Sequence, residues 1–277
     1  MNRLLAVMAL VALPGCSTGS PKEAAPGAGV RPGFHFKPGD KLKMSTRGDF
    51  DFKERAVGED RDGLYMSGRL SFTVEIEILE PEKDGFAARL TPRTFDYLSG
   101  SDALEFKEGK LTRSEEAEKD DLTLPTQAFE IKVTNEGLLA SARVNREFTD
   151  LMFVGPVPAQ PDSLLGWLGS LPAVDLREGA TWTAAPHVML AHDDAMPMNV
   201  VVKRIKRDED GWSVGLLVGV DKTSDKYAWL KTCVETGTGS LELDPRGRPV
   251  RAAVSWEAKT PDGQPIGEYQ WTCEFFR

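Results

Sequence analysis

The chain has 277 residues, of which 40% are hydrophobic and 28% are charged. This composition is ample for a packed core and excludes a chain that is disordered throughout. The net charge is -9, so no basic surface is expected to neutralise phosphates; nucleic acid is excluded as a partner, and an acidic face would be repelled by anionic lipid.

The N-terminus has the pattern of a secretion signal followed by a tether. Asn2 and Arg3 give a short polar, basic start, and residues 4–13 form an apolar run. The run has signal-peptide length and is too short to span a bilayer in the mature protein. Residues 1–15 are therefore predicted to be removed. Residues 16–32 contain Gly, Pro, Ala and Ser without an apolar period, which predicts a flexible tether.

The signal ends at Leu13-Pro14-Gly15-Cys16, which resembles the lipobox of bacterial lipoproteins. In that family the cysteine is acylated before the signal is removed. The resemblance implies that Cys16 becomes the new N-terminus and anchors the protein in a membrane through its acyl chains. In this family an Asp after the cysteine tends to retain the protein at the inner membrane. Ser17 stands there instead, so we expect the outer membrane, with the body facing the periplasm or the exterior.

A first β lobe is predicted over residues 33–144. Its centre is a hairpin over residues 72–90, in which apolar and polar residues alternate on both sides of a turn at Asp84-Gly85. Residues 104–125 are rich in carboxylates. They lack the spacing of a calcium loop and are predicted to form a solvated loop.

A second β lobe is predicted over residues 174–277, joined to the first by short helices in the linker 145–173. The hairpin recurs over residues 198–216 with a turn at Asp210-Gly211, and an aromatic residue follows the turn in both copies. The predicted fold class is therefore mainly β, with two duplicated antiparallel-sheet lobes joined by short helices.

Two cysteines remain once Cys16 is acylated. Cys233 and Cys273 each share strand parity with apolar residues, and secretion places them in an oxidising compartment. A structural disulfide between them is the expected pairing, with a stabilisation of a few kcal/mol for a closed loop of about forty residues. The alternative is two buried thiols.

No catalytic residue and no cofactor are predicted. The pentapeptide over residues 211–215 matches the serine-hydrolase elbow, but Ser213 falls on a predicted strand and no histidine follows it. A weak candidate metal site groups His187, His192 and Asp193 on a predicted loop, where solvated side chains are the more common outcome.

Two functions fit these observations, and an enzyme with an unrecognised site is a third. The first is a lipid-anchored, non-catalytic binding or scaffold module of the cell envelope, with a protein, glycan or lipid as its partner. The second is a carrier that holds lipid or another apolar ligand in a curved-sheet cavity. Its predicted architecture resembles uncharacterised all-β envelope lipoproteins and, weakly, the half-barrel fold of periplasmic lipoprotein carriers.

Overall fold

A computed structural model of the chain describes residues 29–53, 65–115, 118, 126–137, 139–143, 171–184, 198–222 and 232–277. The signal, Cys16 and most of the predicted tether lie outside these ranges, and so does the linker apart from residues 171–173. In the described part, no helix is long and apolar enough to cross a membrane.

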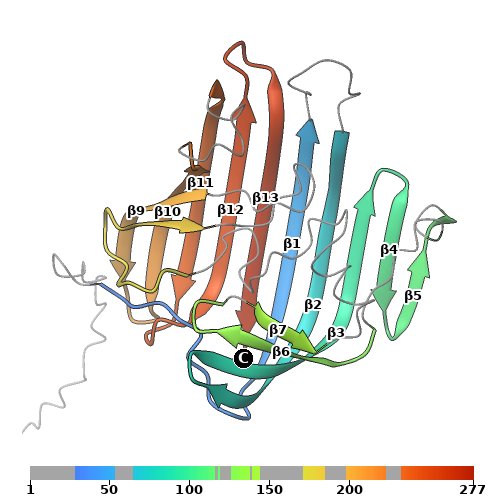
Figure 1. Cartoon of the computed structure of the whole chain (residues 1–277), viewed down its shortest axis with the longest axis vertical. Helices are drawn as coiled ribbons and strands as arrows, with labels where there is room; N and C mark the ends of the chain where they lie inside the picture. The colour runs from blue at the N-terminus through green and yellow to red at the C-terminus, as the bar shows by residue number, and fades with distance from the viewer. Residues whose placement is uncertain are drawn as a thin grey trace, which may run out of the picture.

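The described residues form one antiparallel sheet of thirteen strands (Figure 1). The strands are β1 (Lys41–Lys53), β2 (Tyr65–Glu82), β3 (Gly85–Ser99), β4 (Asp102–Lys107), β5 (Lys110–Arg113), β6 (Phe129–Thr134), β7 (Leu139–Arg143), β8 (Thr181–Ala184), β9 (Met198–Arg207), β10 (Trp212–Val220), β11 (Val234–Leu243), β12 (Pro249–Lys259) and β13 (Pro265–Phe276). Their order is β5-β4-β3-β2-β1-β13-β12-β11-β10-β9-β8, and β6 pairs with both β3 and β7. The mainly β prediction is confirmed.

The prediction of two duplicated lobes is wrong, because the two halves are joined edge to edge. β1 and β13 lie side by side at the centre of the sheet in Figure 1 and pair from Lys43↔Phe276 to Phe52↔Gly267. Two separate lobes would each have left one of these strands at an edge, with unpaired backbone groups. Pairing the first strand with the last satisfies those groups and makes one sheet.

Both predicted hairpins are confirmed as strand pairs, β2 with β3 and β9 with β10. The glycine of each turn, Gly85 or Gly211, allows a neighbouring strand to approach closely. A Cβ atom on Gly85 would collide with the carbonyl oxygen of Val133, and one on Gly211 would collide with that of Leu243. Only glycine therefore allows the next strand, β6 or β11, to approach at this point.

The predicted solvated loop over residues 104–125 is wrong in its first part. β4 and β5 form a hairpin there, and Leu104 and Phe106 are buried while Glu105 between them is exposed. The charged residues occupy one face of a strand, and the other face joins the core.

Burial alternates along the strands, so the sheet has one apolar face and one polar face. In β10, Trp212 and Val214 are buried and Ser213 between them is exposed. The apolar faces of both halves belong to one hydrophobic core. Each buried aromatic or branched side chain contributes about 1.5–3 kcal/mol on removal from water.

Ion pairs between neighbouring strands line the polar face. Arg89 lies 3.2 Å from Glu130 across β3 and β6, and Arg251 lies 3.2 Å from Glu274 across β12 and β13. These side chains are close to half exposed, so each pair contributes at most about 1 kcal/mol. The pattern identifies this face as the one that meets water.

The N-terminal segment, residues 29–37, closes one end of the core. The ring centroids of Phe34 and Phe275 are 5.5 Å apart, and those of Phe36 and Phe86 are 5.6 Å apart. Both pairs meet edge to face, which is a favourable aromatic geometry. The segment therefore joins β13 and β3 at the end of the sheet where β1 begins.

Candidate anion-binding site

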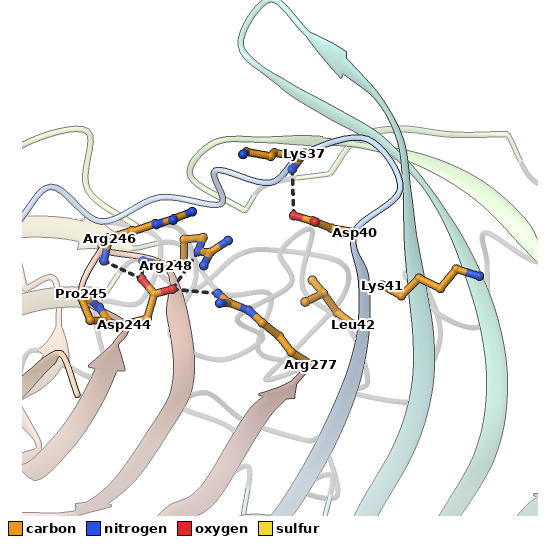
Figure 2. A pocket seen from close by; sticks show the side chains of 9 residues that line it. All are labelled: Lys37, Asp40, Lys41, Leu42, Asp244, Pro245, Arg246, Arg248 and Arg277. Carbon is orange, nitrogen blue, oxygen red and sulfur yellow. Dashed lines mark hydrogen bonds and ion pairs between the residues drawn. The ribbon is translucent and has the colours of Figure 1, made fainter.

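A pocket of about 620 Å³ lies at that end of the sheet (Figure 2). It is formed where β1 begins, where β11 turns into β12 and where β13 ends. We call it the basic pocket. Its lining residues are Lys37, Asp40, Lys41, Leu42, Asp244, Pro245, Arg246, Arg248 and Arg277.

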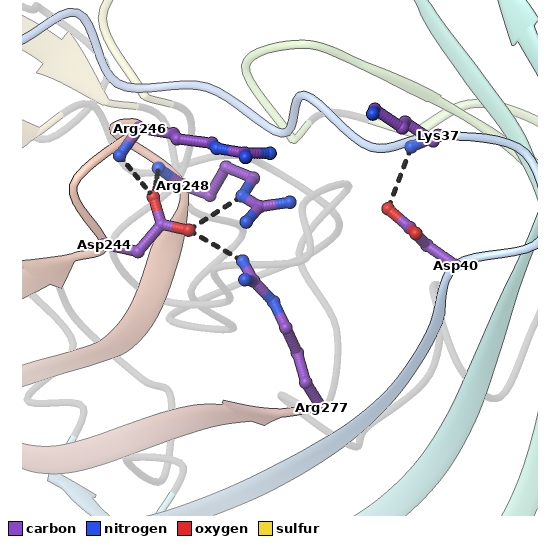
Figure 3. A network of polar contacts seen from close by, with 6 residues as sticks. All are labelled: Lys37, Asp40, Asp244, Arg246, Arg248 and Arg277. Carbon is purple, nitrogen blue, oxygen red and sulfur yellow. Dashed lines mark hydrogen bonds and ion pairs between the residues drawn. The ribbon is translucent and has the colours of Figure 1, made fainter.

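Asp244 organises one wall of the basic pocket (Figure 3). Its Oδ1 atom accepts the backbone N–H groups of Arg246 at 2.8 Å and Arg248 at 3.0 Å. Its Oδ2 atom accepts Nε–H of Arg248 at 2.8 Å and Nη2–H of Arg277 at 2.7 Å. One carboxylate thus fixes the turn and holds two guanidinium groups beside each other.

The local sequence explains this turn. An Asp at the start of a turn accepts backbone N–H groups two residues on, and a Pro after it presets the backbone dihedral φ. Gly247 has φ of +81°, a conformation that favours glycine, and its N–H is bonded to the carbonyl oxygen of Asp244 at 2.9 Å. The run from Asp244 to Arg248 therefore folds so that both of its arginines flank the carboxylate.

The carboxylate of Asp244 stays ionised. Burial acts to raise the pKa of Asp244, but the hydrogen bonds from the Arg248 backbone and from the side chains of Arg277 and Arg248 outweigh it and bring the pKa to about 2. A carboxylate that accepts several N–H donors is expected to behave in this way. It balances part of the charge of the two arginines at any physiological pH.

The basic pocket retains an excess of positive charge. Five of its lining residues are cationic, and only Asp40 and Asp244 are acidic. In the part of the chain that the structure describes, neither Lys37 Nζ nor the Arg246 guanidinium makes an ion pair. Figure 2 shows the three arginines on one side and Lys37 on the other.

The arginines differ in exposure. The side chain of Arg248 is 10% exposed and its guanidinium lies 5.9 Å from the ring of Phe36. The side chain of Arg277 is 49% exposed. Arg248 is therefore largely enclosed by the fold, whereas about half of the Arg277 side chain is open to a ligand. Guanidinium groups present paired N–H donors that match carboxylate and phosphate oxygens.

The expected disulfide between Cys233 and Cys273 is not formed. Cys273 pairs with Ala252 of β12, and Val234, next to Cys233, pairs with Lys259 of the same strand. The two partners on β12, Ala252 and Lys259, are seven residues apart, which corresponds to roughly 23 Å along the strand. The two cysteines are therefore separated by a similar distance. A disulfide requires Cα atoms less than about 7 Å apart.

Of the other site residues considered from the sequence, only Ser213 lies in the part of the chain that the structure describes. Ser213 lies within β10 on the polar face and not on a strand-to-helix turn, so the hydrolase elbow is absent. Cys16, His187, His192 and Asp193 lie outside the described residues. Among the residues that are described, no group of three His, Cys, Asp or Glu is placed to hold a metal ion.

The basic pocket was not predicted from the sequence. A net charge of -9 hid it, because the charge of a whole chain says nothing about one end of a sheet. A local signal was present in the turn, where Arg246 and Arg248 flank Gly247, three residues after Asp244. Lys37 and Arg277 join them only because β1 pairs with β13.

Comparison with known proteins places the chain in no family. No protein-family model matches it, and no curated protein matches it. Several solved structures, three of which follow, are similar to it at low identity. A lipovitellin structure, titled for its lipid–protein interactions, is 14% identical with a TM-score of 0.49; the match covers 88% of this chain, which spans only 26% of the lipovitellin chain.

The other two are more distant. An outer membrane channel from Pseudomonas putida F1 is 8% identical with a TM-score of 0.26, covering 92% of this chain and all of that one. A β-barrel-like protein of unknown function from Brucella abortus is 10% identical with a TM-score of 0.21, covering 85% of this chain and 96% of that one. All three TM-scores are below 0.5, so function is argued from the residues of this chain.

Proposed function

We propose that this chain is a lipid-anchored binding module of the bacterial cell envelope, and that it binds an anionic ligand in the basic pocket without chemistry of its own. The observation that carries the proposal is the pair of guanidinium groups held by Asp244 beside two cations, Lys37 and Arg246, that make no ion pair with any residue the structure describes. The lipobox resemblance at Cys16 supports anchoring, and the best-supported location is the outer membrane.

The geometry suits binding better than catalysis. Four cationic side chains, those of Lys37, Arg246, Arg248 and Arg277, surround the basic pocket, whereas Lys41 points away from it and pairs with Glu77 (Figure 2). The ionised carboxylate of Asp244 accepts four hydrogen bonds. Such a carboxylate is a poor proton acceptor, since its pKa is about 2. Cations that the fold already holds in place lower the ordering cost of binding an anion.

The alternative role, a carrier of lipid or another apolar ligand, would use the apolar face of the sheet. Among the residues that the structure describes, the side chains on that face are buried; Ile76 and Trp256, for example, are each only 1% exposed. A carrier would need this face to open. The basic pocket needs no such rearrangement, so anion binding is the function we favour.

Calorimetric titration of the membrane-extracted protein with inorganic phosphate tests the proposal. The informative variant combines Lys37→Gln with Arg246→Gln. Because neither side chain makes an ion pair with a described residue, we expect the variant to keep the fold, which its circular dichroism spectrum checks. We expect at least tenfold weaker binding, because each lost charge-assisted hydrogen bond contributes about 1.5–3 kcal/mol. Equal affinity in the parent and the variant would refute the proposal.

A matched control removes a cation elsewhere. Arg251 is 47% exposed on the polar face of β12, where it pairs with Glu242 and Glu274. The variant Arg251→Gln changes the net charge by one unit but leaves the basic pocket intact. Its affinity for phosphate should equal that of the parent chain.

A further inference from the structure

We propose that the ligand of the basic pocket is the phosphate head group of an anionic phospholipid in the membrane that anchors the chain. This inference rests on the proposed function, since it needs both an anion site and the anchor at Cys16. It adds the chemical class of the ligand and the place where the ligand is found.

The N-terminal segment passes directly beside the basic pocket. The N–H of Gly33 is bonded to the carbonyl oxygen of Gly247 at 3.0 Å, and a Cβ atom on Gly247 would collide with the carbonyl oxygen of Arg31. Gly247 lies between the two arginines of the turn, Arg246 and Arg248. The described chain on the side of Cys16 therefore runs past the turn that carries two of the pocket's arginines, and Val30 bridges to Leu176 beyond it.

The length of that chain keeps the pocket near the bilayer. Thirteen positions separate Cys16 from Gly29, the first described residue. Even fully extended, they span at most about 45 Å. β1 runs away from this end for thirteen residues, which is a further ~40 Å. Anchoring through Cys16 thus gives head groups a higher effective concentration at the basic pocket than at the far end of the sheet.

The chemistry of the lining fits a phosphate that carries an organic part. Arg246, Arg248 and Arg277 supply guanidinium donors on one side, and Lys37 supplies an ammonium group on the other. Arginine forks bind phosphate oxygens in pairs. A volume of about 620 Å³ is that of a ligand-sized site and not of a bare ion, so a glycerol backbone has room beside the phosphate.

Two apolar side chains are exposed at the end of the sheet that holds the basic pocket. Phe276 is 47% exposed and Val250 is 39% exposed. Phe276 follows the buried Phe275 and so lies on the polar face, near the pocket but outside its lining. This end of the sheet thus offers apolar side chains as well as cations to the boundary between head groups and acyl chains.

General attraction to an anionic surface does not explain such binding. The acidic turn over residues 208–210 lies beside the pocket, since Gly211 approaches Asp244, and the whole chain has a net charge of -9. An anionic membrane would repel a broad negative surface of the protein. One head group must therefore enter the pocket, and binding should saturate at one lipid per chain.

Arginine footprinting tests this inference on the anchored protein. The protein is reconstituted in nanodiscs of phosphatidylcholine alone, or with added phosphatidylglycerol, and treated with phenylglyoxal, which modifies accessible guanidinium groups. We expect phosphatidylglycerol to lower the modification rates of Arg246 and Arg277 at least fivefold. Arg47, 72% exposed on the polar face of β1, serves as the internal reference and should not change.

Three outcomes separate the two proposals. Protection of Arg277 by phosphatidylglycerol that is lost in the Lys37→Gln, Arg246→Gln chain supports the head-group inference. Protection by inorganic phosphate in detergent, without protection by phosphatidylglycerol, overturns the head-group inference and leaves the proposed function standing. Protection by neither overturns both.

Discussion

Arg277, directly after β13, donates a hydrogen bond from Nη2 to Oδ2 of Asp244 at 2.7 Å and so ties the last strand to the turn between β11 and β12. The same oxygen accepts Nε–H of Arg248. The carboxylate thus both stabilises the fold and arranges the cations of the basic pocket.

Replacing this carboxylate should destabilise the chain. In Asp244→Asn the side chain of Arg248, only 10% exposed, loses its counter-ion. We expect a loss of about 2–3 kcal/mol in the free energy of unfolding, measured by urea denaturation, because a buried charge is left unpaired. Asp49→Asn, which removes a surface partner of Arg47, is the control and should cost under about 1 kcal/mol.

The same group predicts a dependence of stability on pH. The pKa of Asp244 lies at about 2 in the folded chain, below its ordinary value of 3.8, so the unfolded chain binds the proton more readily. Its contribution of roughly 2 kcal/mol is fully present above about pH 4 and is lost as the pH falls toward 2. The stability gap between the parent and Asp244→Asn should therefore narrow over that range. A gap that is constant with pH would contradict the assignment.

The glycines after the hairpin turns should not tolerate a side chain. In Gly211→Ala the new methyl group collides with the backbone of Leu243, and φ is +149° at this position. We expect a loss of about 2–3 kcal/mol, visible as a lower thermal midpoint. Gly215→Ala on the same strand is the matched control, since its nearest neighbour would be Arg204 Cβ at an ordinary 3.7 Å.

The two cysteines should behave as buried thiols. Burial raises the pKa of Cys273 to about 12, with Thr46 as a hydrogen-bond donor to its sulfur. In a chain carrying Cys16→Ser, a thiol reagent should find two thiols after denaturation without reductant, and far slower reaction in the native state. Thiols that appear only after reduction would show that a disulfide does form.

The local part of the fold could be predicted from the sequence, and the long-range part could not. Alternation located both hairpins because strand faces differ in burial. Nothing local signals that Lys43 pairs with Phe276, and this pairing is what replaces two lobes by one sheet. Shared parity placed both cysteines on the apolar face, but parity does not measure distance along a strand.

The candidate site illustrates the same limit. The run from Asp244 to Arg248 has the residues of a turn, and its two arginines make it locally basic. A charge profile along the sequence would have indicated this turn as part of a basic site. Lys37 and Arg277 are 240 positions apart and meet only through β1 and β13. The net charge of -9 is summed over the whole chain, so it does not reveal a local cluster of basic residues such as the basic pocket.

A crystal structure of the protein grown with phosphate, at a concentration that saturates the calorimetric titration, tests the central claim most directly. We predict one phosphate in the basic pocket, within hydrogen-bond distance of Arg246 and Arg277 and facing Lys37. Phosphate bound elsewhere, with these side chains contacting only solvent, would contradict the account.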